Sequence, residues 1–218
     1  MGKIFDMDSP VMRFLNRVAD LLMLNILMIF CCIPVITIGA SFTAMHYVIL
    51  KMVRGEEGYL FRGFFKSFVR NFKQATLIWL IMLLAMAVFI GDSLIFKYSM
   101  VEFPKILVTA VVAVGIIMLL VGMYVFPLLA RFENTIRNTI KNAAILMLAN
   151  LPKTLLMAFF YVAPLIIGYF STYSYIFIFM FGISVPAYGA AWLYSGIFKK
   201  LEPESEETSD LDFTIDTN

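Results

Sequence analysis

The sequence predicts an all-α protein, a polytopic transmembrane helix bundle, and composition is the first reason. Sixty-one per cent of the 218 residues are hydrophobic and only 15 % are charged, whereas a soluble domain is closer to half apolar. The excess is concentrated in runs of about 20 residues, which are long enough to cross a hydrocarbon core of ~30 Å. Most of these runs lack the polar face that a helix of a soluble protein needs. We expect one membrane-embedded helical domain over residues 1–200, with five full spans and a shorter helix.

The first span begins at a recognisable helix start. Ser9 is a good N-cap and Pro10 suits the first helical position, so a helix is predicted from there to about Ile33. Pro34 and Gly39 then interrupt the apolar run. A short or re-entrant helix follows the break over residues 41–53, and the sequence leaves open whether it spans the membrane, re-enters it or lies in its interface.

Two topologies follow from this break, and the positive charges distinguish them. If residues 21–39 are one span, twelve of the 17 Lys and Arg lie on one side of the membrane. If the chain instead turns back at residues 34–40, fifteen of the 17 lie on one side. Because Lys and Arg collect on the cytoplasmic side, we favour the hairpin. It places both termini in the cytoplasm of a multi-pass protein of the cell membrane.

Within the stretch over residues 54–75, a turn is predicted at Gly55–Gly58 and a basic amphipathic cytoplasmic helix after it, which continues without a break into a span over 75–96. On a helical projection its aromatic residues fall within about 100° of arc and its cations within the neighbouring arc of about 80°. The aromatic edge consists of Phe61, Phe64, Phe65, Phe68 and Phe72, and the cationic edge of Arg62, Lys66, Arg70 and Lys73. Such a helix suits a membrane interface, so these nine residues are a candidate docking surface for phospholipid or a protein partner.

Three more spans are predicted beyond residue 104. In the span over 105–126, Gly115 and Gly122 lie on nearly the same face, which favours close approach of another helix. A half-helix over 144–150, a break at Pro152 and a span from residue 154 bent at Pro164 come next. The last span runs over 175–198, with Pro186 inside it.

An amide stripe is predicted on the second cytoplasmic stretch. Asn134, Asn138 and Asn142 recur at i, i+4 and i+8, which places them on one face of a helix. We treat the three as a candidate polar site that bonds to the first cytoplasmic helix or faces solvent. Residues 201–218 form an acidic tail without a basic residue, and its low apolar content predicts disorder.

Several sequence blocks resemble the YesL-like family of small bacterial membrane proteins. The blocks are Ile33–Ser41, Lys51–Tyr59, Asn71–Ala75 and Tyr124–Thr135, with Asn142–Ala143 downstream. They occur in the expected order and the resemblance covers roughly residues 5–200. It implies a domain of unknown function whose genes often neighbour ABC-type sugar importers and polysaccharide-degrading enzymes. The family has no established catalytic or ligand-binding residues, so none is carried over.

The expected function is therefore a non-catalytic accessory or scaffold in the membrane, linked to carbohydrate uptake through a partner such as an ABC-type sugar permease. The alternative is a small transporter or channel with a site at broken helices. Its candidate residues within the spans are Asn25, Thr43, His46, Asp92 and Ser184. The chain has no zinc-ligand spacing, nucleophile elbow or P-loop, so we expect neither an enzyme nor a cofactor. Phospholipid is a sufficient partner for the basic helix, so we expect no nucleic acid. The sequence does not set the oligomeric state.

Overall fold

A computed structural model describes residues 10–56, 58–98 and 104–202, and no strand occurs within these ranges. The elements are α1 (Pro10–Cys31), a 3-10 turn η1 (Val35–Thr37), α2 (Ile38–Arg54), α3 (Leu60–Tyr98), α4 (Lys105–Arg131), α5 (Ile136–Ala149), α6 (Leu151–Phe170), a 3-10 turn η2 (Thr172–Ser174), α7 (Tyr175–Phe181) and α8 (Ser184–Lys199). Ser9, proposed above as an N-cap, and the tail beyond residue 202 lie outside the described residues.

The predicted all-α membrane architecture is confirmed. Within the described ranges, five helical stretches are long and apolar enough to cross a membrane: Pro10–Cys31, Val35–Arg54, Leu60–Phe96, Lys105–Arg131 and Leu151–Phe170. A sixth candidate span is formed by Thr172–Phe181 and Ser184–Lys199, which are bent by 57° relative to each other. The basic helix and the span after it are one continuous helix, α3, of 39 residues, as predicted.

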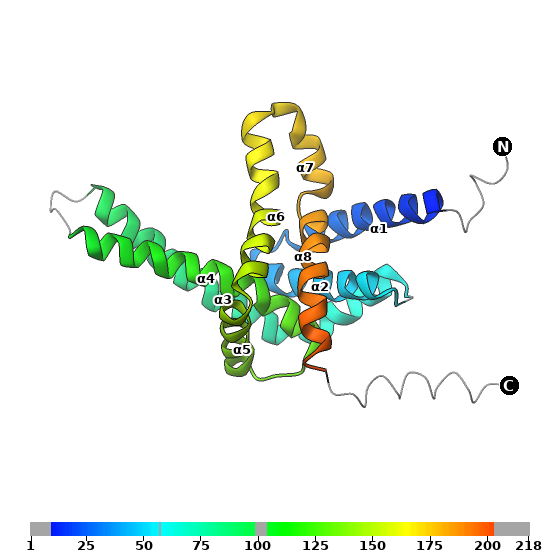
Figure 1. Cartoon of the computed structure of the whole chain (residues 1–218), viewed down its shortest axis with the longest axis horizontal. Coiled ribbons are helices and arrows are strands. Elements are labelled where there is room, and N and C mark those ends of the chain that lie inside the picture. Colours follow the sequence, from blue (N-terminus) through cyan, green and yellow to red (C-terminus); the bar gives the residue numbers. More distant parts are fainter. Residues whose placement is uncertain (1–9, 57, 99–103, 203–218) are drawn as a thin grey trace.

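The first apolar run forms a helical hairpin. The alternative topology, with one span over residues 21–39, is therefore wrong. The chain leaves α1 at Cys31 and enters α2 at Ile38, and Figure 1 shows the two helices running in opposite directions. The Thr37 hydroxyl lies 2.5 Å from the Cys31 carbonyl oxygen and 2.7 Å from that of Pro34, which fixes the turn. The second helix is longer than the expected 41–53, because with η1 it forms a 20-residue stretch of spanning length.

Helix α2 is the centre of the molecule. Eleven of its 17 residues are buried, and it contacts α1, α3, α4 and α8. It approaches α3 closely at Gly39: a Cβ there would lie 2.6 Å from Trp79 Cβ and closer still to the Ala75 carbonyl oxygen. The Trp79 indole also donates a hydrogen bond to the Val35 carbonyl oxygen at 2.8 Å. Gly39 therefore allows the backbones of α2 and α3 to meet.

Two helical hairpins project from this centre as arms. Figure 1 shows α3 and α4 leaving it in one direction, and α6 and α7 in another. In α4, every buried residue except Gly115 lies between Tyr124 and Ala130, at the central end; α7 has none. Within the first arm the Phe89 ring lies against Gly115 and the Met82 methyl against Gly122, which confirms the predicted close approach.

The predicted breaks in the later helices are displaced. The half-helix expected at 144–150 is the end of the longer α5, and Asn150 separates it from α6, which has Pro152 in its first turn. The last span is not one helix with a proline inside it: the chain breaks at Gly182, and Pro186 lies in the first turn of α8. Proline is tolerated in a first turn because its missing N–H would have no helical acceptor there.

Candidate functional site

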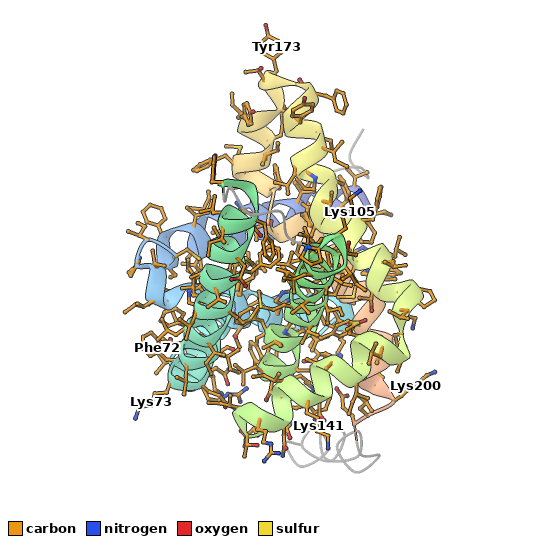
Figure 2. The ribbon with its side chains drawn as sticks, turned by 90° about the vertical axis from the view of Figure 1, so that its left-hand side faces the viewer. Phe72, Lys73, Lys105, Lys141, Tyr173 and Lys200 are labelled. Atoms are coloured by element: carbon orange, nitrogen blue, oxygen red, sulfur yellow. The ribbon has the colours of Figure 1, made fainter. Side chains whose placement is uncertain are left out.

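Basic residues from three separate stretches lie at one end of the molecule. Figure 2 shows Lys73 of α3, Lys141 of α5 and Lys200 after α8 at this end, whereas Tyr173 lies at the opposite end and Lys105 lies between the two ends. We call the end that carries Lys73, Lys141 and Lys200 the basic end. Because these lysines are far apart in sequence, the fold itself gathers their charge.

The cationic edge of α3 is exposed as predicted, but its aromatic edge is divided. Arg62, Lys66, Arg70 and Lys73 are all exposed. Phe64 is fully buried in the core, and Phe68 and Phe72 are half-buried against it. Phe61 and Phe65, about half exposed, are the two of these five rings that are most accessible to lipid or a partner. The sequence projection placed all five rings correctly on one edge but did not show that α2 and its neighbours cover part of that edge.

A first groove, of about 630 Å³, lies at the N-terminal end of α3 and is lined by four cations, two of which belong to the α3 row. Its charged lining consists of Arg17, Lys51, Arg62 and Lys66 with Asp20 and Glu56. The Tyr47 ring, also in the lining, lies 5.4 Å from Lys51 Nζ and 5.8 Å from the guanidinium carbon of Arg70, so it stabilises two cations. Arg17 and Lys51 thus lie at the same end of the molecule, which is the arrangement that the hairpin requires.

A second groove, of about 800 Å³, brings the two predicted sites together. We call it the amide groove; its polar lining consists of Arg70, Asn71, Lys73, Gln74, Glu133, Asn134, Thr135 and Asn138. The Gln74 side chain donates a hydrogen bond to the Asn134 carbonyl oxygen, which links α3 directly to the second basic stretch.

The prediction that three asparagines share one face of a helix is wrong for the first of them, Asn134. Asn134 lies in the loop before α5, which begins at Ile136. Thr135 ends that loop as the N-cap, and its hydroxyl oxygen accepts a hydrogen bond from the Asn138 N–H at 3.4 Å. Asn142 lines a neighbouring cavity of about 290 Å³ that also contains Asn134 and Leu201. The three amides therefore border two adjoining hollows, not one helical face.

A cluster of ion pairs that the sequence analysis did not predict lies at the basic end. The Arg54 guanidinium donates to both carboxylate oxygens of Glu202, at 3.0 and 2.7 Å, and Arg131 Nε donates to one of them at 2.8 Å. The side chains of Arg54 and Glu202 are only 7 % and 15 % exposed. Burial alone would raise the pKa of Glu202, but the hydrogen bonds and charges of the two arginines lower this pKa below its ordinary value.

The cluster joins elements that the sequence keeps apart. Arg54 ends α2, Arg131 ends α4, and Glu202 follows α8. Leu201 and Glu202 therefore belong to the helical domain, although we assigned them above to a disordered tail. The available sequence signal was two arginines at the ends of apolar helices and the first acidic residue after the last span.

The polar residues of the spans mostly bond to other parts of the protein. The Asn25 side chain donates to the Phe179 carbonyl oxygen at 2.8 Å and accepts from the N–H groups of Ile183 (3.2 Å) and Ser184 (3.0 Å). It thereby satisfies backbone groups that the break between α7 and α8 frees. His46 Nδ1 lies 3.0 Å from the Tyr194 hydroxyl.

The remaining candidates of the transporter hypothesis are dispersed. The Thr43 hydroxyl donates to the Gly39 carbonyl oxygen of its own helix, and the Ser184 hydroxyl is buried without a hydrogen-bond partner. Asp92 lines an apolar groove of about 560 Å³ between α3 and α4. The part of the chain that the structure describes contains no group of three or more His, Cys, Asp or Glu positioned to hold a metal ion.

Comparison with known proteins finds one family model that matches part of the chain. Residues 21–93 match the sequence model of a family described as "Protein of unknown function, DUF624". The matched part contains the second half of α1, all of α2 and most of α3, and therefore both the central helix and the exposed cations of α3. No curated protein and no solved structure is significantly similar to the chain. The segment over residues 21–93 is thus similar to DUF624 proteins.

Proposed function

We propose that this chain is a YesL-like, non-catalytic accessory or scaffold protein of the bacterial cell membrane, with its basic end in the cytoplasm. The observation that carries the proposal is the exposed row of Arg62, Lys66, Arg70 and Lys73, next to two exposed rings. Its last member, Lys73, lies at the end where Lys141 and Lys200 also lie. Positive charge retained on one side favours the cytoplasmic face. The partner suggested by the resemblance is an ABC-type sugar permease, and the role is an accessory one in carbohydrate uptake.

Phospholipid is the simplest ligand for this row. Each exposed cation near an anionic leaflet contributes about 1 kcal/mol of attraction, and the rings of Phe61 and Phe65 suit the acyl boundary. In a protein already held by several spans, such attraction is not needed for anchoring. It orients the basic end at the headgroups and leaves the grooves beside α3 accessible to a cytoplasmic domain of a partner.

A small transporter or channel is the second candidate, and the broken span favours it. The α7–α8 break resembles the discontinuous helices that build substrate sites in transporters, and the buried Ser184 hydroxyl beside it has no partner. Against this candidate, Asn25 and His46 already bond within the protein. Uptake of sugars or monovalent cations into proteoliposomes would distinguish the two candidates.

The docking proposal predicts a large effect of charge reversal at the four cations. In R62E/K66E/R70E/K73E, we expect retention of anionic lipid to fall about tenfold or more, because each lost attraction is worth about 1 kcal/mol and 1.4 kcal/mol is a factor of ten. The measurement is native mass spectrometry of phosphatidylglycerol that stays bound after purification. Affinity capture in mild detergent, from cells that express either protein, should show loss of a transporter subunit.

The matched control is Lys105→Glu, because Lys105 is exposed but lies away from the basic end. This variant should retain both lipid and partner. Equal lipid retention and equal partners for the fourfold variant and the control would show that the row is merely solvated. If the unaltered protein is captured repeatedly without any transporter subunit, the proposed link to sugar uptake is contradicted. The proposal that the row binds anionic lipid is not affected by that outcome.

A further inference from the structure

Glu202 is the last residue that the structure describes, and its contacts fix its position at the basic end. Glu202 is held by three hydrogen bonds from Arg54 and Arg131. Directly before it, Leu201 lines the cavity that also contains Phe132 and Asn134. Whatever follows Glu202 must therefore begin beside this cavity.

The cavity leads into the amide groove. Phe132 and Asn134 line both hollows, so a chain that passes them enters a groove that presents Arg70 and Lys73. Glu133 lines the same groove and is its one acidic lining residue among those described. The Asn138 side chain is exposed on its rim and offers an amide donor.

The sequence that follows has the complementary charge. Residues 203–218 contain no Lys, Arg or His, and their acidic residues are Glu204, Glu206, Glu207, Asp210, Asp212 and Asp216. A segment of this length extends up to about 50 Å, far more than is needed to follow an adjoining groove. Each exposed ion pair is individually weak, because water and salt screen it. The tether at Glu202 makes the contact intramolecular, with an effective concentration of order mM, so pairs with two cations keep part of the population bound.

We propose that residues 203–218 lie along the amide groove of their own chain, with carboxylates opposite Arg70 and Lys73. The Glu202 cluster positions this segment where it begins. The bound segment occupies two of the four cations of the exposed α3 row. It therefore competes with anionic lipid or an acidic partner surface for that part of the basic end.

Zero-length carbodiimide cross-linking of the full chain tests this contact. The protein is placed singly in nanodiscs of neutral phosphatidylcholine, which removes both anionic lipid and partner. We expect an amide bond between Lys73 and a carboxylate of residues 204–212, located by mass spectrometry. Raising the salt to 0.5 M shortens the screening length to about 4 Å and should lower the yield about threefold or more.

The chain supplies its own controls. Lys51 Nζ lies 3.6 Å from a Glu56 carboxylate oxygen, so this pair should cross-link in every sample. Lys105, which lies away from the basic end, should not link to the segment. Lys73→Arg keeps the cation and removes the reactive amine, so the Lys73 link should vanish in this variant. Glu202→Ala releases the start of the segment and should lower the yield several-fold.

Two outcomes would overturn the proposal. One is the absence of any link from Lys73 to residues 203–218 in samples where Lys51 and Glu56 are linked. The other is a link that, in discs holding one ¹⁵N-labelled and one unlabelled chain, forms only between the two chains, because the occupant would then be a second copy. Neither outcome affects the lipid and partner measurements of the proposed function, since no anionic lipid or partner is present.

Discussion

The central helix α2 and the long helices of the outer arms are all apolar enough to cross a membrane, but they differ in what covers them. Eleven of the 17 residues of α2 are buried by other helices, whereas α7 contains no buried residue and α6 only three. The neighbours of α2 are protein, with fixed shape. The arms leave their apolar side chains to the bilayer, which is fluid. Substitutions should therefore be costly at the centre and mild in the arms.

The largest effect is expected at Gly39. In Gly39→Ala the new methyl group would meet Trp79 Cβ and the Ala75 carbonyl oxygen, neither of which can move without shifting α3. We expect the free energy of unfolding to fall by about 3 kcal/mol or more, as in severe overpacking. Unfolding by SDS titration measures it. Gly91→Ala is the matched control, because nothing lies within 4 Å of a Cβ there, and equal losses in the two variants would contradict the contrast.

An intermediate effect is expected at Glu202, which joins the centre to the chain after α8. Glu202→Gln leaves the poorly exposed Arg54 without its counter-charge, so we expect a loss of about 2 kcal/mol in the free energy of unfolding near neutral pH. The folded state lowers the pKa of Glu202. The stabilisation is therefore complete above the unfolded pKa of about 4.5 and disappears as pH falls through the lower folded value.

The stability difference between the unaltered protein and Glu202→Gln should accordingly shrink on acidification below about pH 4.5. Parallel SDS titrations at several pH values isolate it from the other carboxylates, which are common to both proteins. A difference that stays constant with pH would show that the cluster does not depend on the charge of Glu202.

The smallest effect is expected in the arm at Gly115. A Cβ there would lie 2.5 Å from Phe89 Cε2, but this is the outer edge of a ring in an arm bordered by a 560 Å³ apolar groove. The ring can turn toward the groove or the lipid. We expect Gly115→Ala to lower the free energy of unfolding by about 1 kcal/mol or less by SDS titration. A loss as large as that of Gly39→Ala would show that the arm is packed as rigidly as the centre.

The same contrast explains which parts of the fold could be predicted. Spans in lipid are apolar on every face, so α3, α4 and α6 are recognisable from composition alone. The hairpin at Pro34 was recognisable because proline and glycine interrupt the run and the charges favour a turn. The break expected at Pro152 lies two residues earlier, at Asn150. The break at Gly182 was missed, because its stability depends on contacts from elsewhere, such as the Asn25 side chain.

The candidate site was predictable only where one helix carries it. The exposed cations of α3 follow from helical periodicity, and so does the edge on which its five phenylalanines lie. That Phe64 is buried depends on the neighbouring helices, and that Asn134 precedes α5 depends on the Thr135 cap. The pairing of Arg54 and Arg131 with Glu202 spans most of the chain and leaves no local pattern.

The unbroken length of α3 has a mechanical consequence. Thirty-nine residues at 1.5 Å each give a rod of about 58 Å, nearly twice the thickness of a hydrocarbon core. One half of the rod carries the apolar wall of an arm and the other half carries the four exposed cations. A helix that adapts to bilayer thickness does so by tilting, and a continuous rod tilts as one piece. Any change in bilayer thickness that tilts the apolar half of α3 therefore also displaces the row of cations on its other half.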